Sequence, residues 1–207
     1  MDLSQFEKQI ESTLKWKKIK EIPNFPIIHL EELKKKINSG EYSISIDFTT
    51  ANEFARWLYG ARYAIFFSIL ASTPFILATI SVILAFILKN YYLLFGIISA
   101  FAGFFLSNPY NPSKSFWKSM VGILLLVCFY GIWQDNLTMT FLSGFFIIPF
   151  FVNEFIYNLN RNKLKEIALN SEKIFIFLFQ NGKLRLRNNK TGESYWYQEI
   201  KSLNKQP

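Results

Sequence analysis

Four long apolar runs follow one another in the middle of the chain, between flanks in which apolar and charged residues alternate. The runs cover residues 63–88, 91–107, 116–133 and 137–157. A helix needs about 20 apolar residues to cross a ~30 Å hydrocarbon layer, and the shorter runs lie near the lower limit. Only two residues follow the first run and three follow the third, so both pairs are expected to form antiparallel hairpins. The pattern predicts four membrane-spanning helices, kinked at Pro74 and Pro149.

The segment before the first run begins with the patterns of two helices. Residues 3–20 carry apolar side chains at helical spacing with charges between them, which predicts an amphipathic helix. Residues 28–40 predict a second, shorter helix that ends at their Asn-Ser-Gly sequence.

A strand and a capped helix are expected next. In residues 42–48, Ile44 and Ile46 alternate with polar side chains, which is typical of a half-buried strand. Thr50 and Glu53 match a capping box, in which each side chain accepts a hydrogen bond from a free backbone N–H. The helix that this box predicts leads directly into the first apolar run.

The segment after the fourth run predicts a helix followed by strands. Residues 172–180, "EKIFIFLFQ", are apolar on both faces and are expected to form a central strand. Asn181-Gly182 is a strong hairpin signal, because a type I′ turn needs two positive φ angles. Residues 183–188 and 193–200 then predict two further strands.

These strands and the one at 42–48 predict a four-stranded sheet built from both ends of the chain. Neither flank alone has enough apolar residues for a core, whereas together they reach an ordinary small-domain size. The expected fold is therefore a polytopic α-helical membrane protein with a small split cytoplasmic α+β domain. Its parts are residues 1–61, the four-helix transmembrane domain 62–158, and the tail 159–207.

Composition and charge agree with a membrane core between aqueous segments. Hydrophobic residues make up 51% of the chain and include 23 Phe, more than a soluble domain of 207 residues readily buries. The net charge of +8 belongs mainly to residues 161–207, which carry ten basic and four acidic residues.

The basic residues beside the apolar runs indicate an orientation. Short cytoplasmic loops carry an excess of Lys and Arg. Only Lys89 lies beside the runs on one side, whereas seven basic residues lie on the other: Arg56, Arg62, Lys114, Lys118, Arg161, Lys163 and Lys165. Both termini are expected in the cytoplasm, and the protein is expected in a bacterial inner membrane.

Short patterns on either side of the apolar core carry a family resemblance. Thr50, Glu53 and Phe54 follow the first strand, and Trp196, Glu199 and Ile200 close the tail. In these positions the chain resembles YcxB-like bacterial membrane proteins. The resemblance implies a pleckstrin-homology-like sheet, but that family usually has two spans where this chain has four, and it implies no functional residue.

Signals of enzymatic chemistry are nearly absent from the sequence. The single histidine, His29, has no other His or Cys at metal-ligand spacing, so no metal or cofactor is expected. The single cysteine, Cys128, lies inside an apolar run. Lys190-Thr-Gly lacks the upstream glycines of a phosphate loop and reads as a turn. The protein is expected not to be an enzyme.

One cluster of polar residues falls inside a predicted span. Ionisable side chains within a membrane usually have a function. Glu154 lies near the inner end of the fourth run, where it is expected either to pair with Lys118 at the interface or to form a polar pathway with Asn153.

Two further groups of residues are candidates for packing and for binding. Small residues at four-residue spacing let helices approach closely, within the bundle or between copies of the chain; they are Gly96, Ser99, Ala100, Gly103 and Ser107. A basic stripe follows one predicted strand and would either be solvated or contact anionic headgroups or a phosphorylated ligand; it consists of Lys183, Arg185, Arg187 and Lys190.

Three functions remain open on the sequence alone. The first is a non-enzymatic membrane protein whose cytoplasmic domain binds a protein partner or a small ligand and is coupled to the bundle. The second is an oligomeric pore, or a membrane-perturbing effector or immunity protein of a bacterial defence or bacteriocin system. The third is a small transporter. The expected partners are the lipid bilayer and further copies of the chain, and nucleic acid is not expected because no extended basic surface is predicted.

Overall fold

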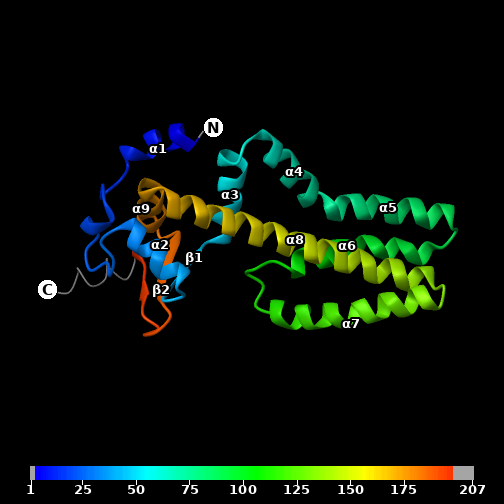
Figure 1. Cartoon of the computed structure of the whole chain (residues 1–207). Helices are drawn as coiled ribbons and strands as arrows, with labels where there is room; N and C mark the ends of the chain where they lie inside the picture. Colours follow the sequence, from blue (N-terminus) through cyan, green and yellow to red (C-terminus); the bar gives the residue numbers. More distant parts are fainter. Residues whose placement is uncertain (1–2, 198–207) are drawn as a thin grey trace. The chain divides into compact units, whose positions relative to one another are not determined.

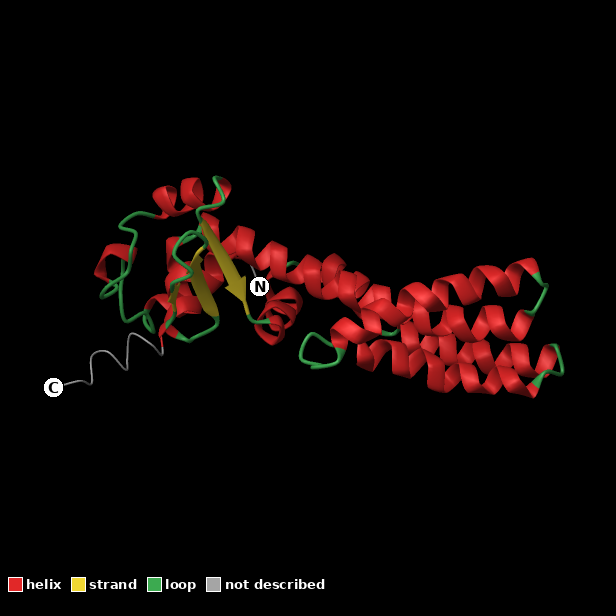
Figure 2. Cartoon of the chain, turned by 90° about the horizontal axis from the view of Figure 1, so that it is seen from below, coloured by secondary structure: helices red, strands yellow, loops and turns green. Residues whose placement is uncertain are grey.

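The chain is mostly helical and contains a small three-stranded sheet (Figures 1 and 2). The computed structural model describes residues 3–197, apart from the side chains of residues 55–58. The chain divides into two compact units. Residues up to 64 and residues from 159 onwards form one unit, here called the terminal unit, and residues 65–158 form the other, here called the bundle.

The terminal unit holds the sheet and most of the shorter helices. Two of its helices, α4 and α8, cross the boundary between the units and therefore belong to both. Its elements are α1 (Leu3–Glu11), η1 (Ile19–Glu21), α2 (Leu30–Asn38), β1 (Tyr42–Ile46), α3 (Phe48–Leu58), the start of α4 (Ala61–Ala71), the end of α8 (Leu137–Asn170), α9 (Glu172–Gln180), β2 (Leu184–Asn188) and β3 (Ser194–Tyr195).

The sheet joins residues from opposite ends of the sequence. Its strand order is β1-β2-β3, with both neighbouring pairs antiparallel. Tyr42 pairs with Asn188 and Ile46 with Leu184. The expected alternation is present over residues 42–46, where Ile44 and Ile46 face the core. The strand ends two residues sooner than expected, because Asp47 caps the helix that begins at Phe48.

The expectation of a central strand at residues 172–180 is wrong, because this segment is helix α9. Ser171 caps its start by accepting a hydrogen bond from the Ile174 N–H. Phe175 and Phe179 stack one turn apart, and both are fully buried. The segment is apolar on both sides because α9 lies inside the core of the terminal unit, where a helix needs no polar face.

Asn181-Gly182 consequently ends a helix and does not form a hairpin. Gly182 adopts a φ of 67°, and the Lys183 N–H donates to the Leu178 carbonyl at 2.9 Å. A glycine with positive φ just after a helix, followed by a residue whose N–H bonds to a carbonyl five residues earlier, forms the Schellman motif that ends many helices. Within residues 3–197 the sheet therefore has three strands, where four were expected. Residues 198–200 of the expected last strand, including Glu199 and Ile200, lie outside the described residues.

The first helix is shorter than the pattern at residues 3–20 predicts. It ends at Glu11, and the chain then turns toward α9, where the Lys15 N–H donates to the Gln180 side-chain oxygen at 2.9 Å. Trp16 and Ile19 are buried in the core beyond this turn. The apolar residues after Glu11 are thus core anchors of an irregular segment, whose tertiary contacts override helical propensity.

Helix α3 begins earlier than the capping box at Thr50 predicts. Its N-cap is Asp47, whose carboxylate accepts hydrogen bonds from the N–H and the hydroxyl of Thr50, each at 3.0 Å. Thr50 therefore lies inside the helix, and the expected role of Thr50 and Glu53 as the capping pair is wrong. Aspartate caps at least as well as threonine, and its position directly after β1 allows the helix to start three residues sooner.

The bundle contains the apolar helices. Two of them, α7 (Lys114–Trp133) and α8, are long and apolar enough to cross a membrane. A third candidate is the pair formed by α4 and α5 (Thr73–Ile87), which bends by 45° at a break before Pro74. The run at 91–107 forms η2 (Tyr91–Leu94) and α6 (Phe95–Leu106), which together are shorter than an ordinary span. Helix α8 continues unbroken through Pro149.

The outer surface of the bundle is apolar. Large side chains such as Phe75, Ile98, Leu126 and Trp133 are more than half exposed. An aqueous surface rarely carries so many large apolar groups, whereas a lipid-facing surface requires them. These helices are therefore compatible with insertion into a membrane.

The pairing of β1 with β2 predicts that a change in β1 will destabilise the tail. We expect Ile46→Ala to lower the free energy of unfolding of the terminal unit by about 2–5 kcal/mol, because a buried Ile truncated to Ala loses apolar contacts and leaves a cavity. The rate of trypsin cleavage after Lys183, Arg185 and Arg187 measures this loss of stability. Ile28→Ala is the matched control because Ile28 is 57% exposed. A tail that stays as trypsin-resistant as in the unchanged chain would contradict the prediction.

Candidate functional site

A polar network in the terminal unit joins three helices. Asn160 of α8 is fully buried and accepts a hydrogen bond from the Tyr63 hydroxyl of α4 at 2.5 Å. Its amide nitrogen donates to the side-chain oxygen of Asn52 in α3 at 2.7 Å. Both ends of the Asn160 amide are thus satisfied, as a buried amide requires.

A lysine and two tyrosines surround this network. The ammonium group of Lys163 lies 4.8 Å from the ring centre of Tyr59 and 4.6 Å from that of Tyr63, within the range of cation–π attraction. Burial raises the pKa of Tyr59, with a smaller contribution from Tyr63. Burial, with the adjacent Arg161, lowers the pKa of Lys165 on the next turn of α8. The junction of α3, α4 and α8 is therefore partly withdrawn from water.

The basic stripe predicted from the sequence lies on the solvent side of the sheet. Arg185 and Arg187 are exposed, while Leu184 and Leu186 between them are buried in the core. The guanidinium of Arg185 lies 5.6 Å from the ring centre of Trp196. An open pocket of about 500 Å³ follows this face; its lining consists of Ser43, Ile44, Ser45, Arg185, Arg187, Gly192 and Ser194.

The two lysines of the stripe have different surroundings. Lys183 is exposed and continues the alternation of Arg185 and Arg187. Lys190 lies beyond the end of β2, where its ammonium group is 3.8 Å from the Glu41 carboxylate. Near the same turn, Glu193 accepts a hydrogen bond from the Tyr195 hydroxyl at 2.8 Å. Burial, followed by this hydrogen bond, raises the pKa of Tyr195 to about 12.

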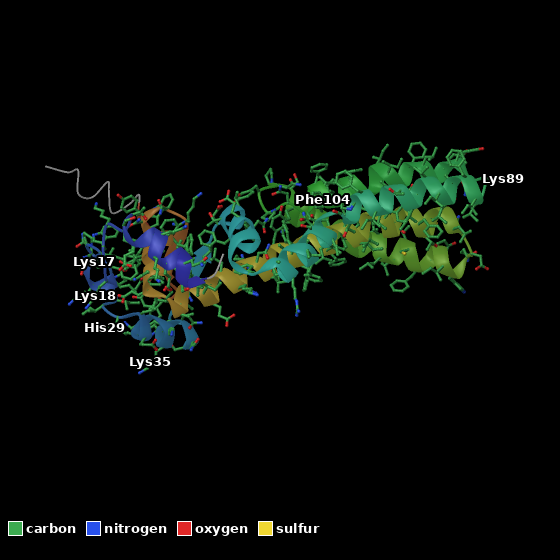
Figure 3. The ribbon with its side chains drawn as sticks, turned by 90° about the horizontal axis from the view of Figure 1, so that it is seen from above. Lys17, Lys18, His29, Lys35, Lys89 and Phe104 are labelled. Carbon is green, nitrogen blue, oxygen red and sulfur yellow. The ribbon has the colours of Figure 1, made fainter. Side chains whose placement is uncertain are left out.

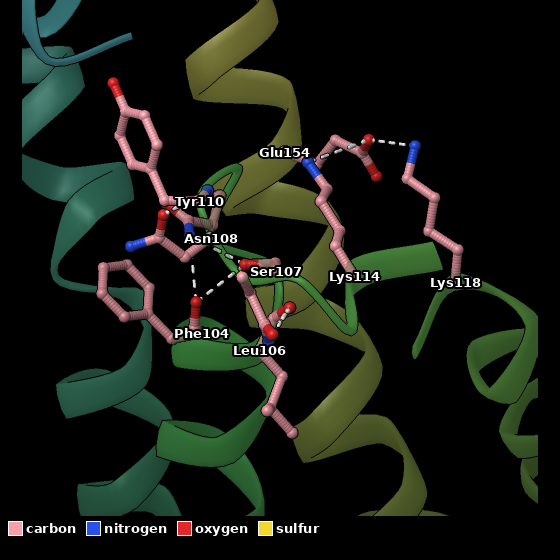
Figure 4. Close-up of polar contacts among 10 residues, drawn as sticks. Phe104, Leu106, Ser107, Asn108, Tyr110, Lys114, Lys118 and Glu154 are labelled. Atoms are coloured by element: carbon pink, nitrogen blue, oxygen red, sulfur yellow. Dashed lines mark hydrogen bonds and ion pairs between the residues drawn. The ribbon is translucent and has the colours of Figure 1, made fainter. Parts of the chain in front are cut away.

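Three ionisable residues of the bundle, Lys114, Lys118 and Glu154, form a cluster (Figure 4). One carboxylate oxygen of Glu154 lies 2.5 Å from the Lys118 ammonium and 3.6 Å from that of Lys114. Glu154 and Lys114 are mostly covered, whereas half of the Lys118 side chain is exposed. The geometry is that of an ion pair between α7 and α8.

Asn153 faces a different neighbour from Glu154. Its amide nitrogen donates to the Phe104 carbonyl at 3.0 Å and to the Ser107 hydroxyl at 2.7 Å, both at the end of α6. The Ser107 hydroxyl donates in turn to the Phe104 carbonyl at 2.7 Å. Asn153 and Ser107 are buried, so this bond fastens α8 to α6. The structure does not bring Asn153 and Glu154 together into one site.

The small residues of the second apolar run lie against other helices of the same chain. Gly96 packs against Phe145 of α8, and a side chain on Gly103 would overlap the backbone carbonyl of Phe146. The Ser99 hydroxyl donates to the Leu142 carbonyl at 2.7 Å, and Ala100 is fully buried. The stripe therefore allows α6 and α8 to approach within the bundle.

The remaining candidates carry little chemistry. His29 is exposed at the N-cap of α2, with no capping hydrogen bond from its side chain. Within residues 3–197, no group of three or more His, Cys, Asp or Glu side chains lies close enough to hold a metal ion.

Sequence reasoning missed Asn160 and the serines beside the arginines. Asn160 follows Asn153 by seven residues, so both lie on one face of α8, and this spacing of two asparagines was the available signal. The serines could be recognised only from the register, which places Ser43 opposite Arg187 and Ser45 opposite Arg185.

No family model matches the chain, and no curated protein or solved structure matches it. The resemblance to YcxB-like proteins therefore stays a prediction.

The close approach of α6 and α8 predicts opposite effects for two glycine substitutions. We expect Gly103→Ala to destabilise the bundle by about 1–3 kcal/mol, because the added methyl group meets the rigid backbone of α8. Gly122→Ala in α7 is the control, since nothing lies within 4 Å of the added carbon and alanine favours a helix. Thermal unfolding in detergent measures both variants. A midpoint for Gly103→Ala at or above that of Gly122→Ala would contradict the prediction.

Proposed function

We propose that this chain is a non-enzymatic, four-span protein of a bacterial inner membrane, with both termini in the cytoplasm. In this proposal the terminal unit is a split cytoplasmic α+β domain that binds a protein partner or a small ligand. Binding is transmitted to the bundle through α4 and α8, the helices that belong to both units.

The observation that carries the proposal is the network around Asn160. It fastens α3, which follows β1 directly, to α4 and α8. A change in the sheet can therefore act on the two helices that continue into the bundle. A bonded and buried amide resists sliding of these helices, since leaving one polar group unpaired costs about 1–3 kcal/mol.

The number of spans is supported by a parity argument. Strands β1 and β2 belong to one sheet and must lie on the same side of a membrane, so the chain between them crosses it an even number of times. Three candidate spans, α4–α5, α7 and α8, would give an odd number. The proposal therefore assigns the fourth crossing to η2 and α6.

The dimensions of this segment fit such a crossing. Four residues of 3₁₀-helix and twelve of α-helix extend about 26 Å, close to the ~30 Å hydrocarbon layer. The exposed Tyr91 and Tyr92 at its start suit a membrane interface. The other even number is two crossings, made by α7 and α8. In that case α5 and α6 would form a re-entrant hairpin.

Cysteine labelling separates four crossings from two. In a Cys128→Ser background, we expect Lys89→Cys and Gln134→Cys to react with an impermeant maleimide added outside the cells. Ser113→Cys should react only after the membrane is permeabilised. If Lys89→Cys also required permeabilisation, the hairpin would be re-entrant and the four-span proposal would fail.

Two unfolding probes test the coupling. Cys128 is the only cysteine and lies in α7, so its reaction with a thiol dye reports unfolding of the bundle, while trypsin cleavage in β2 reports unfolding of the terminal unit. We expect coinciding midpoints in the unchanged chain and separate midpoints in Asn160→Ala, which loses both hydrogen bonds of the amide. Asn181→Ala, at the exposed end of α9, is the matched control. Midpoints that still coincide in Asn160→Ala would contradict transmission through the network.

A further inference from the structure

The pocket on the solvent side of the sheet has the donors of an anion site and no acidic lining residue among residues 3–197. The register sets its composition. Ser43 of β1 and Ser194 of β3 lie on either side of Arg187, and Ser45 lies opposite Arg185. Alternation along the strands directs these five side chains to one face, because Ile46, Leu184 and Leu186 are buried in the core on the other.

The donors in this pocket are largely free for a ligand. Among the described residues, Arg185 and Arg187 have no carboxylate within 4 Å, and the hydroxyls of Ser45 and Ser194 have no hydrogen-bond partner. The Ser43 hydroxyl donates to the Asn189 side-chain oxygen at 2.9 Å. Glu193, the acidic residue next to Ser194, accepts hydrogen bonds from the Thr191 and Tyr195 hydroxyls.

We propose that this pocket binds a phosphate group, held by the guanidinium groups of Arg185 and Arg187 and by the flanking serine hydroxyls. Guanidinium presents paired N–H donors that match two oxygens of a phosphate, and hydroxyls can donate to the remaining oxygens. The stack of Arg185 on Trp196 restrains one guanidinium before the ligand arrives. Lys183, on the same edge, adds positive charge that attracts an anion.

The inference rests on the proposed function, in which the terminal unit is the ligand-binding part, and it names the ligand chemistry. The phosphate can come from a soluble compound or from the headgroup of an anionic lipid. Both sources offer the same oxygens to the pocket, so two probes are needed to distinguish them.

The test uses the full chain in maltoside micelles, which contain no phosphorus, at low ionic strength. ³¹P line broadening is measured for inorganic phosphate and, separately, for dihexanoyl phosphatidate, with protein-free micelles as the blank. We expect saturable binding of at least one probe and a loss of about tenfold or more in affinity in the double variant Arg185→Gln/Arg187→Gln. Binding of both probes would assign the site to the phosphate group itself, and binding of phosphatidate alone would assign it to a lipid headgroup.

The matched control is Lys18→Gln/Lys35→Gln, which removes the same charge from exposed lysines of the same unit (Figure 3). Affinity in this control should stay within about twofold, since distant surface charges are screened. Arg185→Lys/Arg187→Lys keeps the positive charge but loses the paired N–H donors. Its affinity for phosphate should lie between that of the glutamine double variant and that of the control. Failure of both probes to bind, or equal binding by the arginine and control variants, would overturn the proposal.

The coupling experiment keeps the two proposals apart. If Arg185→Gln/Arg187→Gln still shows coinciding unfolding midpoints by the thiol and trypsin probes, a failure to bind phosphate contradicts only the proposed phosphate ligand. The proposed coupling between the units is unaffected. If the midpoints separate in the unchanged chain, the coupling itself fails, whatever the phosphate result.

Discussion

The antiparallel pairing of β1 with β2 is the contact on which the terminal unit depends. The two strands are separated by residues 47–183, and a flexible loop of that length would cost about 4 kcal/mol of entropy to close. Folding of the intervening residues into hairpins reduces this cost, because each hairpin returns the chain to the side from which it started. In the proposed four-span topology, the sheet and the even number of crossings are thus two aspects of one constraint.

Helix α8 serves both units through two buried asparagines. Asn153 bonds to the end of α6 in the bundle, and Asn160 bonds to α3 and α4 in the terminal unit. Apolar contacts alone give little direction to helix packing in lipid, because lipid tails are as apolar as the side chains. A side-chain amide with specific partners fixes the rotation of α8 about its axis, and the arrangement of each unit depends on that rotation.

The sequence predicted those parts of the fold that depend on local pattern. The apolar runs became helices, and the alternation at 42–46 became β1. The errors arose where one pattern serves two structures. Residues 172–180 are apolar on every side, and periodicity cannot separate a buried strand from a buried helix. Ser171 before the run and Gly182 after it were helix signals that should have decided between them.

In the candidate site, too, only the residues that belong to a local pattern could be predicted from the sequence. Arg185 and Arg187 were recognisable from one strand, because their alternation with leucines is a local pattern. Ser43 and Ser194 join them only through the register, which no local pattern specifies. The network at Asn160 likewise depends on partners about a hundred residues away, so the chemistry of its side chain was visible in the sequence but its role was not.

The separation of β1 and β2 also sets an order of events during synthesis. At about 5–20 residues per second, β2 leaves the ribosome on the order of ten seconds after β1. Throughout that interval β1 is an unpaired strand that could aggregate with other chains. It has only five residues and carries Ser43 and Ser45 on its polar face, which limits that hazard. The terminal unit can therefore mature only after the apolar helices have been made, so a finished sheet marks a chain whose hydrophobic segments have already been synthesised.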